Sequence, residues 1–84
     1  MGRWERLCYQ TIIRGLIECQ RINLDRRVWV YRINSMFYPF GSRENYPYKI
    51  WCREMKHLHD FLAESTTHDA SNYSVWRSNR KKSK

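Results

Sequence analysis

RRVWVYRINSMFYPF, residues 26–40, fits both a helix and a β-hairpin, and the fold class depends on which of the two it forms. A helix over residues 25–38 gathers four large side chains on one face: Trp29, Ile33, Met36 and Phe37. A hairpin over residues 28–40 would turn at Asn34 and Ser35, between two runs rich in β-branched and aromatic residues. Asn-Ser is a weaker turn signal than Asn-Gly, and Pro39 would restrict the second strand to a sheet edge. We therefore favour the helix and keep the hairpin as the alternative.

Residues 3–22, RWERLCYQTIIRGLIECQRI, show the clearest helical period in the chain. One apolar stripe recurs at steps of four, four, four and three: Trp4, Cys8, Ile12, Leu16 and Cys19. Leu7, Ile13 and Ile17 widen this stripe. A polar stripe takes the other side: Arg3, Arg6, Gln10, Arg14, Glu18 and Arg21. Gly15 costs about 1 kcal/mol relative to alanine, which one helix of this length tolerates.

A third helix is predicted over residues 47–64, after the loop YPFGSRENYP. Asn45 is a suitable cap, and Pro47 falls in the first turn, where its missing N–H costs nothing. The apolar stripe of this helix consists of Trp51, Met55, Leu58 and Leu62, with Ile50 and Phe61 beside it. Charged side chains take the opposite face: Lys49, Arg53, Lys56 and Asp60.

Residues 65–84 are polar and poor in aliphatic side chains, so we expect a mobile basic tail. Tyr73, Val75 and Trp76 are exceptions that suit a short anchor, either on the helices or on a partner. The sequence therefore predicts an all-α fold. We expect a small bundle of about three helices (3–22, 25–38 and 47–64) forming one domain over residues 1–64, with the tail behind it. The alternative is an α+β fold with the hairpin at 28–40.

Length and composition narrow the class of protein to which this chain can belong. The 84 residues suffice for one domain, and an aromatic content of 15% compensates for the small core such a chain can build. The three cysteines form an odd and sparse set, unlike the framework of a secreted disulfide-rich protein. No run approaches the roughly 18 apolar residues of a membrane span, and no apolar leader follows Met1. We expect a soluble protein of the cytoplasm that does not bind membranes.

Metal and cofactor binding receive little support. Cys52, His57 and His59 form a C-x4-H-x-H pattern, but structural zinc sites use closer pairs such as C-x2-C. On a helix, His57 and His59 point about 200° apart and do not readily share an ion. We expect no metal and no cofactor.

Enzymatic activity is also disfavoured. Cys52 and His57 lie five residues apart on one helix, which is a poor geometry for a nucleophile and its base. The carboxylates of the third helix and the loop before it alternate with basic residues, which predicts solvated ion pairs: Glu44, Glu54, Asp60 and Glu64. No phosphate-binding loop or nucleophile elbow is present. We expect a protein that is not an enzyme.

The charge of the chain favours nucleic acid as a partner. Sixteen Lys and Arg residues face eight Asp and Glu residues, and the excess lies in the first half and in the tail. Clustered basic side chains bind phosphates through counterion release, and arginine adds bidentate and stacking contacts. The expected contact residues to DNA or RNA are Arg3, Arg6, Arg14, Arg21, Arg26, Arg27, Arg77, Arg80, Lys81 and Lys82. No known DNA-binding motif accompanies them.

The alternative function is a protein-interaction module. A small chain rich in Trp, Tyr and Arg carries the residue types that dominate interface energies. An accessory subunit of a larger complex, an inhibitor encoded by a virus or mobile element, or a homo-oligomer would share this composition. The sequence does not separate these partners from DNA or RNA.

Overall fold

The computed structural model describes residues 2–41, 45–64 and 69–82. In chain order it contains α1 (Arg3–Arg21), a 3₁₀ turn η1 (Arg26–Val28), α2 (Trp29–Met36), α3 (Asn45–Glu64) and α4 (Ala70–Lys82). The described part of the chain forms no strand. The predicted all-α fold is confirmed, and the segment that also fitted a hairpin forms η1 and α2.

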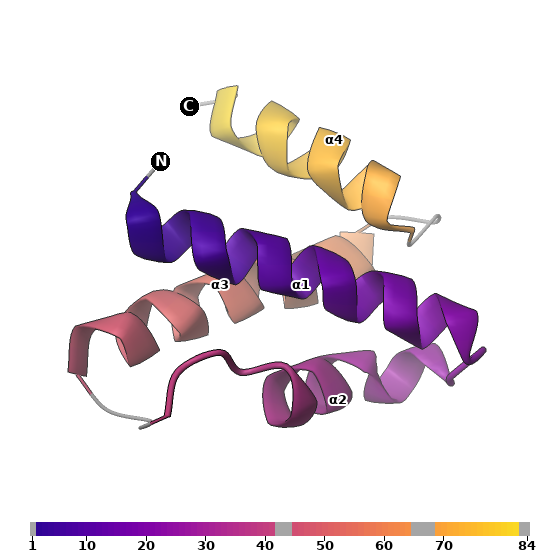
Figure 1. The fold of residues 1–84 in the computed structure, drawn as a ribbon. Coiled ribbons are helices and arrows are strands. Elements are labelled where there is room, and N and C mark those ends of the chain that lie inside the picture. Colours follow the sequence, from indigo (N-terminus) through magenta and orange to yellow (C-terminus); the bar gives the residue numbers. More distant parts are fainter. Residues whose placement is uncertain (1, 42–44, 65–68, 83–84) are drawn as a thin grey trace.

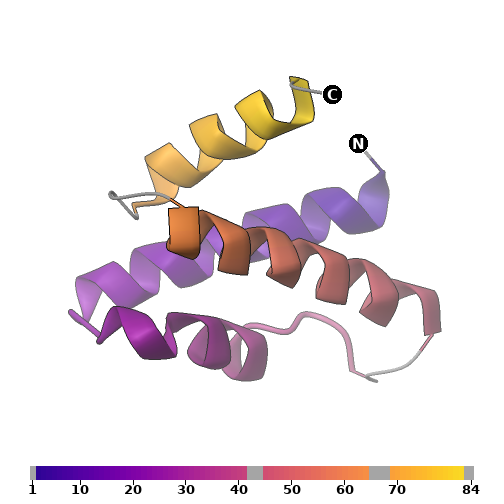
Figure 2. The same ribbon diagram turned by 180° about the vertical axis from the view of Figure 1, so that it is seen from behind.

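The helices form an up-down-up-down arrangement. Helices α1 and α3 make the central pair, while α2 and α4 lie on opposite sides of it, both antiparallel to α1 (Figures 1 and 2). α1 contacts each of the other three helices. The first turn of α1 and the last turn of α4 therefore lie at the same end of the bundle (Figure 1).

The turn between α1 and α2 is built from residues suited to it. Asn23 adopts a left-handed φ of 54°, which asparagine tolerates better than most side chains. Its N–H bonds to the Gln20 carbonyl, and the Leu24 N–H bonds to the Cys19 carbonyl, so two terminal carbonyls of α1 are satisfied. Asp25 then caps η1 by accepting a hydrogen bond from the Arg27 backbone N–H. The chain thus reverses within a few residues and leads into α2.

The core lies between α1 and α3 and reaches both outer helices. The largest fully buried side chains are Trp51, Tyr73, Phe61, Ile12, Leu16, Ile33 and Leu58. The Trp51 indole N–H donates to Asn34 Oδ1 at 2.8 Å, so the polar edge of a buried ring is satisfied by α2. Gly15 allows α1 and α2 to approach closely, because a Cβ at this position would lie 2.7 Å from Ile33 Cγ1.

The structure departs from the expected bundle in its helix count. The described residues form four α-helices instead of about three, because residues 70–82 of the expected tail form α4. Tyr73 is fully buried against Phe61 and Tyr9, which is the first of the two anchoring alternatives. The apolar side chains buried by this helix offset the entropy of ordering it.

Several side chains expected in the core lie outside it. Met36 is 67% exposed, because Phe37 takes the inward position one residue later. On α1, Leu7 and Ile17 are exposed at 39% and 52%, since they lie on the outward side of the helix, about 100° and 180° around its axis from the buried Cys8. No described helix is long and apolar enough to cross a membrane.

Candidate nucleic-acid interface

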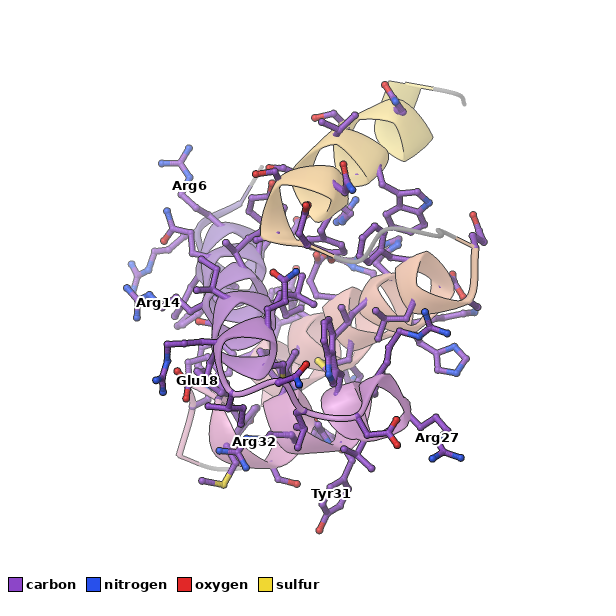
Figure 3. The ribbon with its side chains drawn as sticks, turned by 90° about the vertical axis from the view of Figure 1, so that its right-hand side faces the viewer. Arg6, Arg14, Glu18, Arg27, Tyr31 and Arg32 are labelled. Atoms are coloured by element: carbon purple, nitrogen blue, oxygen red, sulfur yellow. The ribbon has the colours of Figure 1, made fainter. Side chains whose placement is uncertain are left out.

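The outer face of α1 carries three exposed arginines among the predicted contacts. Arg6 and Arg14 are exposed and point into solvent on the same side of the molecule (Figure 3). Within the described part of the chain, neither guanidinium takes part in a salt bridge. Arg3 is also exposed, with its guanidinium 5.0 Å from the centre of the Trp4 ring. These three arginines keep their charge available to a ligand.

Two other predicted contacts are engaged in local ion pairs. Arg21 binds Glu18 through hydrogen bonds of 2.6 and 3.0 Å, and the bond from Arg21 lowers the pKa of Glu18. Arg27 binds Asp25 through its side chain and its backbone N–H, which lowers the pKa of Asp25 from 3.8 to about 2. All four groups remain on the surface, where such pairs contribute little stability.

Arg27, a predicted contact on η1, does not extend the basic face of α1. Arg27 points to the side of the molecule opposite to Arg6 and Arg14 (Figure 3). The reversal of the chain after α1 is the reason, since η1 begins a helix antiparallel to α1. Arg26 is exposed on the same short turn. The structure therefore separates Arg27 from the basic face of α1.

Arg77 is held in the interior. Its Nη2 donates to both carboxylate oxygens of Glu54, at 2.8 and 2.9 Å, and the Glu54 side chain is only 1% exposed. The expectation that Glu54 forms a solvated pair is therefore wrong. Tyr73 lies beside this ion pair, and burial followed by the Glu54 charge raises the pKa of its hydroxyl. Glu44, the loop carboxylate of the same prediction, lies outside the described residues.

The spacing of α3 contained a signal for the burial of Glu54. Trp51, Glu54, Leu58 and Phe61 follow steps of three, four and three, so Glu54 falls within the apolar stripe. All four are buried. A charged residue on such a stripe needs a buried partner, and the partner comes from α4.

The first turn of α1 and the last turn of α4, which both carry basic residues in the sequence, lie at the same end of the bundle. Tyr9 hydrogen-bonds Ser74 and stacks on Tyr73, which fixes the register of α1 against α4. Tyr9 and Ser74 are a pair of facing positions on antiparallel helices. Arg3 lies six residues before Tyr9 and position 80 lies six residues after Ser74, so both lie toward the same end of the bundle. Arg80, Lys81 and Lys82 occupy the last turn of α4, and their side chains are not among those that the structure describes.

A groove opens between α1 and α4, with a volume of about 720 Å³. We call it the α1–α4 groove; it is lined by Tyr9, Gln10, Ile13, Arg14 and Ile17 of α1 and by Ala70, Ser71 and Ser74 of α4. A smaller hollow of about 380 Å³ adjoins it along α1, lined by Arg3, Arg6, Leu7 and Gln10. Sequence reasoning missed the groove, because it forms only where the small side chains of α4 face α1.

The residues weighed as metal ligands lie on α3 without converging. Cys52 and His59 are exposed, and His57 is half-buried. Among the described residues, no group of three or more Cys, His, Asp or Glu side chains is placed to hold a metal ion. Cys8 and Cys19 are buried free thiols, and burial, followed by the charge of Glu54, raises the pKa of Cys8 from 9.0 to about 11.

The chain matches no protein-family model, no curated protein and no solved structure.

Proposed function

We propose that this protein is a small nucleic-acid-binding protein that acts through arginine and lysine contacts to phosphates and catalyses no reaction. The observation that carries the proposal is the placement of two basic segments at one end of the bundle. Arg3 and Arg6 lie near the start of α1, and Arg80, Lys81 and Lys82 lie in the last turn of α4, at the same end of the bundle. Glu5, the acidic residue of the first turn of α1, has its Oε1 3.5 Å from Nη2 of Arg53. Its negative charge is therefore shared with Arg53 and offsets less of the charge of Arg3 and Arg6 than an unpaired carboxylate would.

The exposed arginines of α1 suit phosphate binding. Ion pairs with protein carboxylates would have to be broken before a phosphate could bind Arg21, Arg27 or Arg77. Arg6 and Arg14 need no such exchange within the described residues. Contacts to phosphates carry no sequence information by themselves, so binding should depend on charge and salt rather than on base sequence.

Fluorescence anisotropy with labelled DNA and RNA at increasing salt tests the proposal. The logarithm of the binding constant should fall linearly with the logarithm of the salt concentration, by roughly 0.9 per phosphate contact on duplex DNA. Both nucleic acids are included because phosphate contacts do not separate them. If neither nucleic acid binds at low salt, the proposed function is wrong.

A second candidate function, a protein-interaction module, is favoured by exposed apolar side chains on η1 and α2. Val28, Tyr31 and Met36 are exposed at 42%, 74% and 67%, and Tyr31 projects outward from the molecule (Figure 3). Large apolar side chains left exposed on neighbouring turns are typical of a docking surface for another protein or a second copy of the chain. In this role the protein would act as an accessory subunit or an inhibitor.

Tyr31→Ser combined with Met36→Ser tests this second function. Sedimentation at increasing protein concentration shows whether the chain self-associates and whether the double variant abolishes it. If another protein co-purifies with the wild type but not with the variant, the partner is that protein rather than a second copy of the chain. Val75→Ser, which removes another exposed apolar side chain from α4, is the matched control.

We place either activity in a reducing compartment such as the cytoplasm. The support is that Cys8, Cys19 and Cys52 are all free thiols. Thiols persist in cytosolic proteins, whereas oxidising compartments favour disulfides.

A further inference from the structure

The α1–α4 groove combines an apolar wall with positive charge. Ile17 is 52% exposed there, and Arg14 lies one helical turn before it. None of the side chains that line the groove or the adjoining hollow is acidic. Because Gln10 lines both, they form one path along α1 from Arg3 to Ile17, about 21 Å of helix. A ligand of this path must tolerate apolar contact and carry negative charge.

Duplex nucleic acid fits this path poorly. A duplex hides its bases in the stack and presents phosphates and sugars outside, and proteins read it with an element that enters one of its grooves. A hollow between two helices offers no such protruding element. Ile13 and Ile17 would face the polar exterior of the duplex, which gains nothing from apolar contact.

Single-stranded nucleic acid fits it better. An unpaired base exposes an apolar ring face, and its edge offers hydrogen-bonding groups. The α1–α4 groove supplies matching surfaces: isoleucines for the ring, and the polar side chains of Gln10 and Ser71 for the edge. Arg6 and Arg14, about 12 Å apart along the helix axis, are placed to contact phosphates on either side.

An amphipathic helix of a partner protein is less well matched. Such a helix would pack on the exposed positions of α1 that recur at steps of three and four: Leu7, Gln10, Arg14 and Ile17. The two central positions are polar, so the apolar seam is interrupted. Positive charge with a broken apolar surface is the pattern of a nucleic-acid groove rather than of a helix-binding one.

We propose that the α1–α4 groove receives unpaired bases of single-stranded DNA or RNA while Arg6 and Arg14 contact the adjacent phosphates. The inference rests on the proposed function and narrows its ligand to single strands. Exposed bases and phosphates together complement the groove, whereas phosphates alone complement only its arginines.

Ile17→Gln tests the groove, and Val75→Gln is its matched control. Both replace an exposed aliphatic side chain, at 52% and 59% exposure, but only Ile17 lines the groove. Anisotropy is measured with an unstructured single strand and a duplex of equal length, on variants whose melting temperatures match the wild type. The wild type should prefer the single strand, and Ile17→Gln should weaken single-strand binding about fivefold, because it removes apolar contact with one base ring. Duplex binding should not change, and Val75→Gln should alter neither.

Each other result overturns a definite part of the inference. Equal affinity for both ligands, unchanged by Ile17→Gln, would overturn the groove site and leave a phosphate-binding function intact. Absence of binding to either ligand at low salt would overturn the proposed function as well. Binding of an acidic amphipathic peptide that Ile17→Gln abolishes, without oligonucleotide binding, would assign the groove to a protein partner.

Discussion

Arg77 of α4 donates from Nη2 to both carboxylate oxygens of Glu54 in α3, at 2.8 and 2.9 Å. The exposed fractions of the two side chains are 12% and 1%, so the pair is buried. Removing two charges from water is costly, and their mutual attraction offsets that cost only while both partners are present. The pair therefore joins α4 to α3, although Arg77 and Glu54 are separated by twenty-three residues in the sequence.

Arg77→Met should destabilise the protein by about 3–5 kcal/mol, because it leaves the Glu54 carboxylate buried without a counterion. Glu54→Leu should be costly for the same reason. The double variant should lose much less than the sum of the two, since an apolar pair needs no charge compensation. Urea unfolding followed by circular dichroism provides the three values. Additive losses would mean that the two charges do not stabilise each other.

Sequence periodicity locates the helices whose buried face is aliphatic. A helix is predicted over residues 3–22 and observed over Arg3–Arg21, because each turn of α1 places an apolar side chain on the same face. α4 escapes this reasoning, since its inward face is formed by Tyr73, Trp76 and the charged Arg77. A charged residue such as Arg77 is expected to be solvated unless a buried partner is known. Here that partner, Glu54, lies on another helix.

The candidate interface is only partly predictable for a similar reason. Composition and spacing indicate Arg3, Arg6 and Arg14, which are exposed as expected. The separation of Arg27 from them depends on how the chain reverses after α1. The α1–α4 groove depends on which small side chains of one helix face another, and this follows from packing rather than from local pattern.

Gly15→Ala should destabilise the protein although alanine favours helices. The new Cβ would lie 2.7 Å from Ile33 Cγ1, and Ile33 is fully buried with little room to move. Overpacking of this kind costs about 1–3 kcal/mol, more than the roughly 1 kcal/mol gained in helix propensity. In an Ile33→Ala background the same change should become stabilising, because the clashing atoms are gone. Thermal melts compare the wild type, the two single variants and the double variant. If Gly15→Ala raised the melting temperature in both backgrounds, the close approach of α1 to Ile33 would be contradicted.

The three thiols should differ in reactivity. Cys52 is exposed and should react at once with a chromogenic disulfide reagent at neutral pH, whereas Cys8 and Cys19 are buried and should react only on unfolding. Cys52→Ser should remove the fast phase and leave the slow one. A fast phase that persists in this variant would show that a second thiol is accessible in the folded protein.

Alkaline pH should reveal the buried thiol of Cys8. Burial, followed by the charge of Glu54, raises its pKa from 9.0 to about 11 in the folded protein. A raised pKa means that the folded state holds its proton more tightly than the unfolded state. The stability from this group is complete below pH 9.0 and is lost as the pH rises toward 11. Urea unfolding of wild type and Cys8→Ala across this range measures the difference, and parallel pH profiles would refute the shift.

Charge reversal on α1 should weaken nucleic-acid binding without weakening the fold. Arg6→Glu combined with Arg14→Glu changes two exposed side chains that form no salt bridge within the described residues. Lys49→Glu combined with Lys56→Glu alters the net charge equally on the exposed face of α3 and is the matched control. The α1 variant should reduce the salt slope on duplex DNA by roughly 0.9 for each phosphate that it no longer binds, and the α3 variant should retain more of the slope. If both variants lower affinity and slope to the same extent, only the overall charge matters, and α1 is not the surface that binds nucleic acid.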